Sequence, residues 1–241
     1  MGDYSGLREA IGDSRAIVTC LDGALVDGRT AGGIGKRYLK QAMKDGHYLD
    51  VAWGAANYPV VLAKASLAGE AAGLSHFFWA LGKTGHADIE AGRGFAREYI
   101  EKHQIPGARD FFQRIKSRYS IPVICASIGC DLAVDAAEEF FGFDHTLSNP
   151  VRYDEHGIIT GVDIVIDDED KFEKVDEFLE RVGPFRIGEC FAIGNDALDG
   201  DLMALSRACA ASPLATRDIR ELADKNHGFV IEDYREALSA L

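Results

Sequence analysis

The chain has 241 residues, of which 47% are hydrophobic, so it can bury a sizeable core as one large domain or as a core with one insertion. Its 26 Lys and Arg residues stand against 39 Asp and Glu residues, which gives a formal net charge of −13. This charge repels nucleic acid and anionic membranes unless a basic patch overrides it, and the sequence shows no such patch. We therefore expect neither nucleic acid nor a membrane as a partner.

The first residues contain no basic segment followed by an apolar core and a small-residue cleavage site. No apolar run approaches the roughly 20 residues that span a bilayer, so we expect a cytoplasmic protein. The five cysteines are scattered without the close pairs of a structural zinc site, and we expect reduced, buried thiols. The seven histidines also lack the spacing of metal ligands along the chain.

Short apolar runs predict the buried strands of one sheet. Residues 16–19, 121–126 and 190–193 form such runs, each followed by small or polar residues, and segments with helical spacing separate them. This alternation predicts an α/β fold with a parallel, Rossmann-like sheet and helices on both faces. Because ligands bind beyond the carboxyl ends of such strands, we expect residues 20–22, Ser127 and residues 195–201 to converge.

The segment between residues 30 and 104 has no strand-like run and instead carries aromatic residues at helical spacing. It predicts a helical cap domain, 30–104, inserted into a core made of residues 1–29 and 105–241. Further along the core, we expect helices over 111–119 and 202–209 and a short final strand at 229–231. Asp233 is expected to cap a last helix.

Four segments, in chain order, resemble a known family. They are TCLDGALVDG, the block from Val123 to Gly161, KFEKVDEFL and IGNDALDGDLMAL. The chain resembles the haloacid dehalogenase superfamily, particularly its phosphoserine phosphatase-like branch. The resemblance implies a parallel core sheet with an inserted helical cap, a hydrolase acting on a small phosphorylated metabolite, and Mg²⁺ as the cofactor.

In that family the first strand ends in an aspartate that attacks phosphorus, and an aspartate two residues later acts as acid and base. The resemblance places Cys20 at the first of these positions and Asp22 at the second. It implies that Ser127 hydrogen-bonds the substrate phosphate. It also implies that Lys174, with Lys171 as the alternative, offsets negative charge at the site. Cys20 is either a thiolate nucleophile activated by the lysine or a small residue that replaces a lost aspartate.

The metal-binding segment matches the family in two registers. In the first, Asn195 and Asp199 take the metal positions, so a carboxylate has become a neutral amide. In the second, Asp196 and Asp201 take them, and the leucines after Asp201 favour this register. Mg²⁺ prefers hard oxygen ligands, so a thiol at position 20 weakens its binding in either register.

Two functions remain open from the sequence. The first is a phosphatase-type hydrolase whose cap closes over the site, with Cys20 or an unusual route in place of the aspartyl phosphate. The second is a catalytically inactive relative that binds a phosphorylated ligand or a protein partner. The identity of residue 20 separates the two and favours diminished activity. A dehalogenase is less favoured than either, because it too needs the aspartate nucleophile.

Overall fold

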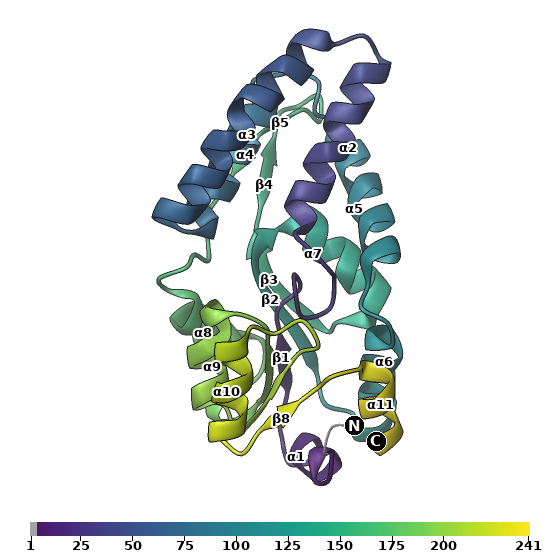
Figure 1. Ribbon diagram of the computed structural model, residues 1–241, viewed down its shortest axis with the longest axis vertical. Coiled ribbons are helices and arrows are strands. Elements are labelled where there is room, and N and C mark those ends of the chain that lie inside the picture. Colours follow the sequence, from purple (N-terminus) through teal and green to yellow (C-terminus); the bar gives the residue numbers. More distant parts are fainter. Residues whose placement is uncertain (1–3) are drawn as a thin grey trace.

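The computed structural model describes residues 4–241, so residues 1–3 of the predicted core lie outside the described chain. Across that range, six parallel strands form one sheet in the order β3-β2-β1-β6-β7-β8 (Figure 1). The strands are β1 (Ile17–Thr19), β2 (Val123–Cys130), β3 (His145–Asn149), β6 (Phe191–Gly194), β7 (Ala208–Ala211) and β8 (Phe229–Val230). The predicted parallel α/β core is therefore confirmed.

Helices cover both faces of this sheet. Successive strand residues point to opposite sides, and because both sides carry apolar residues, both faces are buried. On one face Ile17 of β1 belongs to the same buried cluster as Phe111 and Tyr234. On the other face Val18 is buried with Phe178. The helices are α1 (Leu7–Gly12), α6 (Ala108–Tyr119), α7 (Asp131–Ala137), α8 (Lys171–Val182), α9 (Gly200–Leu205), α10 (Arg217–Lys225) and α11 (Tyr234–Ala240), with the short helices η1 (Glu138–Gly142), η2 (Ile187–Glu189) and η3 (Ala197–Asp199).

Four further helices lie together beyond the sheet (Figure 1). They are α2 (Thr30–Lys44), α3 (Tyr48–Ala68), α4 (Glu70–Gly82) and α5 (Ile89–His103). The antiparallel hairpin of β4 (Val151–Tyr153) and β5 (Ile159–Val162) joins them, and β5 packs on α4. Every residue of α3 is at least partly exposed. The hairpin lies within the predicted core segment, and the border between core and cap stays a prediction.

One predicted element is wrong in its second half. The helix expected over 202–209 ends at Leu205, and residues 208–211 form strand β7 between β6 and β8. Ser206 follows the helix in an extended conformation, and its hydroxyl, with one proton, lies 2.9 Å from the carbonyl oxygens of both Met203 and Ala208. The β7 sequence, Ala-Cys-Ala-Ala, consists of small apolar residues that do not distinguish a helix from a strand. The cap of the last helix is confirmed, since Asp233 accepts a hydrogen bond from the backbone N–H of Arg235.

None of the helices within residues 4–241 is both long and apolar enough to cross a membrane.

Candidate functional site

The side chain of Cys20 lies buried at the carboxyl end of β1, which is flanked by β2 and β6. Its Sγ lies 2.7 Å from an amide atom of Asn195 and 3.1 Å from Oδ2 of Asp199. Asn195 directly follows β6, and Asp199 is the last residue of η3. The expected convergence of the segments at 20–22 and 195–201 is therefore present, and it has the thiol at its centre.

The amide of Asn195 is oriented by its neighbours. Its Nδ2 donates to the carbonyl oxygen of Asp22 at 2.9 Å and to Oδ2 of Asp199 at 3.2 Å. Gly23 permits this close approach, because it has a φ of +76° and a Cβ there would lie 2.3 Å from the Asn195 side chain. The amide thus places its nitrogen, and not its carbonyl oxygen, beside the thiol, and it donates its two protons to Asp22 and Asp199.

The thiol of Cys20 is a neutral hydrogen-bond donor at neutral pH. Burial raises its pKa well above the ordinary value, and the negative charge of Asp199 raises it further. The positive charge of Lys171 lowers this pKa but does not reverse the shift. Because the thiolate is the reactive form of cysteine, this environment works against Cys20 as a nucleophile.

A buried lysine completes the site, and it is Lys171. Its Nζ lies 2.6 Å from Oδ1 of Asp199, and the two side chains are only 6% and 3% exposed. Burial alone would lower the pKa of this ammonium, but the negative charge of Asp199 and its hydrogen bond outweigh burial, so the pKa is raised and Lys171 stays charged.

The expectation that Lys174 is the cation of the site is corrected by this geometry. Helix α8 begins at Lys171, so that residue lies nearest the end of the sheet. Lys174 lies nearly one turn further along, and its Nζ pairs with Glu177 at 3.4 Å on the exposed side. The alternative residue, Lys171, is therefore the one beside Cys20 and Asp199.

The geometry also corrects the preferred register of the last motif. Asn195 and Asp199 are the residues that contact Cys20, as in the first register. Asp196 instead caps η3 by accepting a hydrogen bond from the backbone N–H of Leu198, and Asp201 is exposed in the first turn of α9. The leucines after Asp201 suggested the other register, but both lie in α9, where Leu202 packs in the core and Leu205 is exposed.

These side chains do not fit a Mg²⁺ ion. Mg²⁺ binds through oxygen ligands in a nearly octahedral shell, usually with carboxylates among them. Here the groups around Cys20 are a neutral thiol and an amide nitrogen, and the carboxylate of Asp199 is already paired with an ammonium. The expected magnesium cofactor therefore finds no suitable donor set at Cys20.

Asp22 joins the core to the first cap helix. Its carboxylate accepts hydrogen bonds from the backbone N–H and the hydroxyl of Thr30, the first residue of α2, at 3.1–3.2 Å. Burial raises the pKa of Asp22 from 3.8 to about 7, although the hydrogen bonds from Thr30 oppose this shift. A carboxyl group with this pKa can both donate and accept a proton near neutral pH.

Two charged residues near Asp22 were not predicted from the sequence to belong to the site. Arg29 forms an ion pair with Glu70 at 2.5 Å, and both charges act on Asp22. Glu70 begins α4, and its backbone N–H donates to the Asp168 carboxylate at 2.7 Å in the loop before α8. The turn between α3 and α4 is thereby held against the core. Because Arg29 and Glu70 lie at the starts of separate helices, no local sequence pattern predicts that they form an ion pair.

Ser127 and Asn149 hold the neighbouring strand ends. Ser127 is buried near the end of β2, and its Oγ accepts a hydrogen bond from the N–H of Gly129 at 3.0 Å. Asn149, also buried, donates to the carbonyl oxygens of Ile128 and Ile166 and accepts from the backbone N–H of Val165 and Ile166. It fixes the segment that leads to Lys171, and sequence reasoning missed it because an isolated Asn resembles a turn residue.

Comparisons with known proteins agree with this fold. The sequence profile of haloacid dehalogenase-like hydrolases matches residues 17–204. A search of curated proteins found no match. A solved phosphoserine phosphatase with bound substrate has a TM-score of 0.68 and 19% identity, over 95% of this chain and 98% of that chain.

Other solved structures show the same likeness. A phosphoserine phosphatase solved as a phospho-aspartyl intermediate analogue has a TM-score of 0.66 and 20% identity, over 95% of this chain and 99% of that chain. A protein of unknown function from Bordetella pertussis Tohama I has a TM-score of 0.71 and 15% identity, with 90% and 98% covered. At these identities the similarity shows a shared fold.

Proposed function

Because this chain belongs to the haloacid dehalogenase-like hydrolase family, we propose that it binds a small phosphorylated metabolite but has lost the magnesium-dependent phosphatase reaction. The observation that carries the proposal is the buried, neutral thiol of Cys20 where the family resemblance has its attacking aspartate.

The lost reaction follows from the chemistry of two substituted positions. A phosphoserine phosphatase has been solved as a phospho-aspartyl intermediate analogue, and a thiol cannot form that acyl phosphate. A phosphocysteine would need the thiolate, which burial and Asp199 disfavour. Asn195 replaces a second carboxylate with a neutral amide, whose nitrogen donates hydrogen bonds to Asp22 and Asp199.

The retained groups support binding of a phosphate ester. Lys171 keeps its positive charge in a buried setting, where a charge-assisted hydrogen bond to a phosphate oxygen is strong. Ser127 offers a buried hydroxyl at the end of the adjacent strand. The ion pair of Arg29 and Glu70 adds polar groups beside Asp22 for the rest of the ligand.

A slow, metal-independent phosphatase is the second candidate. The observation that favours it is the pKa of about 7 for Asp22, which suits a general acid or base at neutral pH. In this route Asp22 would activate water, and Cys20 would take no covalent part.

The test combines binding with activity. Inorganic phosphate is titrated calorimetrically into the natural chain and into Ser127→Ala, and hydrolysis of p-nitrophenyl phosphate is measured with and without Mg²⁺. We expect phosphate to bind, with affinity about tenfold lower in Ser127→Ala, as for one hydrogen bond to a charged group. We expect no hydrolysis that responds to Mg²⁺.

The other outcomes are distinct. Magnesium-stimulated hydrolysis by the natural chain contradicts the proposal, and so does a failure to bind phosphate. Hydrolysis without metal that Asp22→Ala abolishes selects the second candidate.

A further inference from the structure

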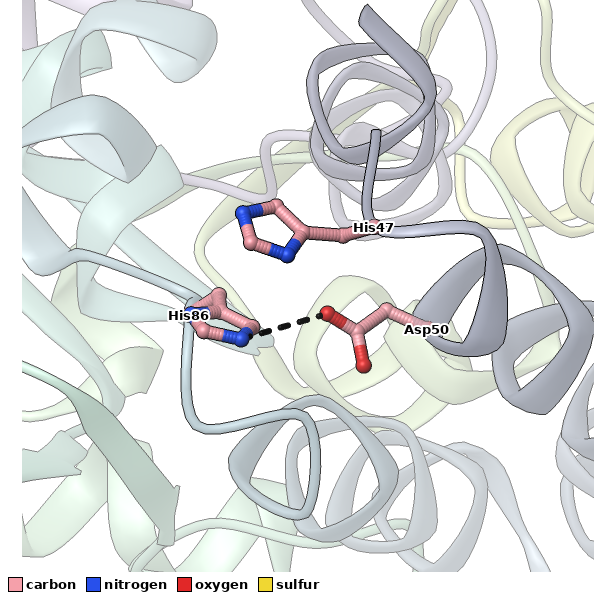
Figure 2. Close-up of side chains that lie close together, drawn as sticks. All are labelled: His47, Asp50 and His86. Atoms are coloured by element: carbon pink, nitrogen blue, oxygen red, sulfur yellow. Dashed lines mark ion pairs between the residues drawn. The ribbon is translucent and has the colours of Figure 1, made fainter. Parts of the chain in front are cut away.

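A second group of chemistry-bearing side chains lies among the cap helices. His47 immediately precedes α3, Asp50 is in its first turn, and His86 lies between α4 and α5. Each residue offers one possible ligand atom: a ring nitrogen from each histidine and a carboxylate oxygen from Asp50. These three atoms all lie within 4.8 Å of one another. Figure 2 shows ring nitrogens of His47 and His86 turned toward the Asp50 carboxylate.

The contacts among these residues leave one oxygen of the Asp50 carboxylate without a hydrogen bond. Oδ2 of Asp50 lies 3.7 Å from Nε2 of His86, which is too long for a hydrogen bond. This oxygen is buried and finds no hydrogen-bond partner within residues 4–241. A buried polar atom without a partner costs roughly 1–3 kcal/mol, so a bound cation would satisfy a group that the chain leaves open.

We propose that His47, Asp50 and His86 bind a divalent transition-metal ion, with Zn²⁺ as the best fit. Imidazole nitrogens with one carboxylate oxygen suit Zn²⁺ and related ions, whereas Mg²⁺ prefers oxygen ligands alone. Tetrahedral Zn²⁺ with bonds of about 2.0–2.1 Å places its ligands about 3.3 Å apart. Rotation of side chains can bring the three ligand atoms to this spacing, since the His86 side chain is 53% exposed and lies in the connection between α4 and α5.

The surroundings leave room for a further ligand. The three side chains line a cavity of about 190 Å³, whose wall also includes Tyr38 and Phe95. Three protein ligands leave one tetrahedral position for water or for an oxygen of a small molecule. The ion would also link the connection between α2 and α3 to the turn between α4 and α5.

This site is separate from Cys20. Helix α2 begins at Thr30, beside Asp22, and ends at Lys44, shortly before His47. A helix of 15 residues is roughly 22 Å long, so the cluster lies at the end of α2 that is remote from the sheet (Figure 1). The proposed metal site therefore does not depend on the function proposed for Cys20.

The test is a calorimetric titration of the metal-free full chain with Zn²⁺. We expect one ion per chain, with affinity at least tenfold lower in His86→Ala and in Asp50→Asn. His156→Ala is the matched control, because His156 is also exposed but lies in the turn between β4 and β5. Zn²⁺ should raise the thermal unfolding midpoint of the natural chain and of this control more than that of His86→Ala.

A Co²⁺ spectrum identifies the ligands independently of stability. Nitrogen and carboxylate ligands give visible d–d bands without the near-ultraviolet charge-transfer band of a thiolate. A thiolate band that disappears in Cys20→Ser would place the ion at the other site and overturn the proposal. Absence of stoichiometric binding, or equal affinity in all variants, would overturn it as well.

Discussion

Nζ of Lys171 lies 2.6 Å from Oδ1 of Asp199, and the two side chains are almost completely buried next to Cys20. The ammonium neutralises the carboxylate that the neighbouring motif still retains. The buried site is thereby balanced in charge without a divalent ion. This pair explains how the fold tolerates an amide at position 195 and a thiol at position 20.

Breaking this pair should destabilise the protein strongly. Lys171→Met leaves the Asp199 carboxylate buried without its cation, which costs about 3–5 kcal/mol of unfolding free energy. Lys174→Met removes a half-exposed surface pair and should cost less than about 1 kcal/mol. Urea unfolding of both variants measures the difference. Equal losses would show that Lys171 is not the buried partner.

The carboxyl group of Asp22 should make stability depend on pH. The folded chain holds this proton up to about pH 7, whereas the ordinary pKa is 3.8, so the folded state binds more protons between these values. The stability of the natural chain relative to Asp22→Asn should therefore fall as pH rises from about 4 to about 7 and then level off. Urea unfolding at several pH values checks this, and a difference that rises with pH would contradict it.

The thiol of Cys20 should react slowly in the folded protein. Burial and the raised pKa leave little thiolate at pH 7, and all five cysteines are buried. We expect alkylation by iodoacetamide to be more than tenfold slower than in the urea-unfolded chain, with mass spectrometry locating the modified residue. Rapid, selective modification of Cys20 at pH 7 would instead indicate an activated nucleophile.

Asn149 should matter for stability as much as a core residue. Its side chain makes hydrogen bonds to Ile128, Val165 and Ile166, and Asn149→Ala leaves the buried backbone groups of Ile128 and Ile166 without these partners. We expect a loss of about 2–4 kcal/mol in urea unfolding, from several net contributions of about 1 kcal/mol each. Asn226→Ala, an exposed change at the end of α10, serves as the control and should cost less than about 1 kcal/mol.

Much of the fold was predictable because it rests on local patterns. The apolar runs that became β1, β2 and β6 are bounded by turn residues, and their parallel pairing follows from the helices between them. Strands β3 and β7 were not predicted. The residues of His145–Asn149 are largely polar, and the small residues of Ala208–Ala211 favour neither a helix nor a strand. Their identity comes from their neighbours in the sheet.

In the candidate site, the sequence predicted the residues at the strand ends but not the residues from other elements. Cys20, Asp22 and the segment after β6 were expected to meet, because parallel strands bring their carboxyl ends together. The choice of Lys171 over Lys174 depends on where α8 begins, which sequence spacing does not determine. The meeting of His47 with His86 depends on how two helix connections pack, which leaves no signature in either segment.

The most direct test of the lost reaction is to restore the two oxygen ligands together. Hydrolysis of p-nitrophenyl phosphate in Mg²⁺ is compared between the natural chain and the double variant Cys20→Asp/Asn195→Asp. We predict that the natural chain does not hydrolyse p-nitrophenyl phosphate. The double variant should hydrolyse it, and this activity should disappear when Mg²⁺ is chelated. Magnesium-dependent hydrolysis by the natural chain, reduced by the double substitution, would contradict the account.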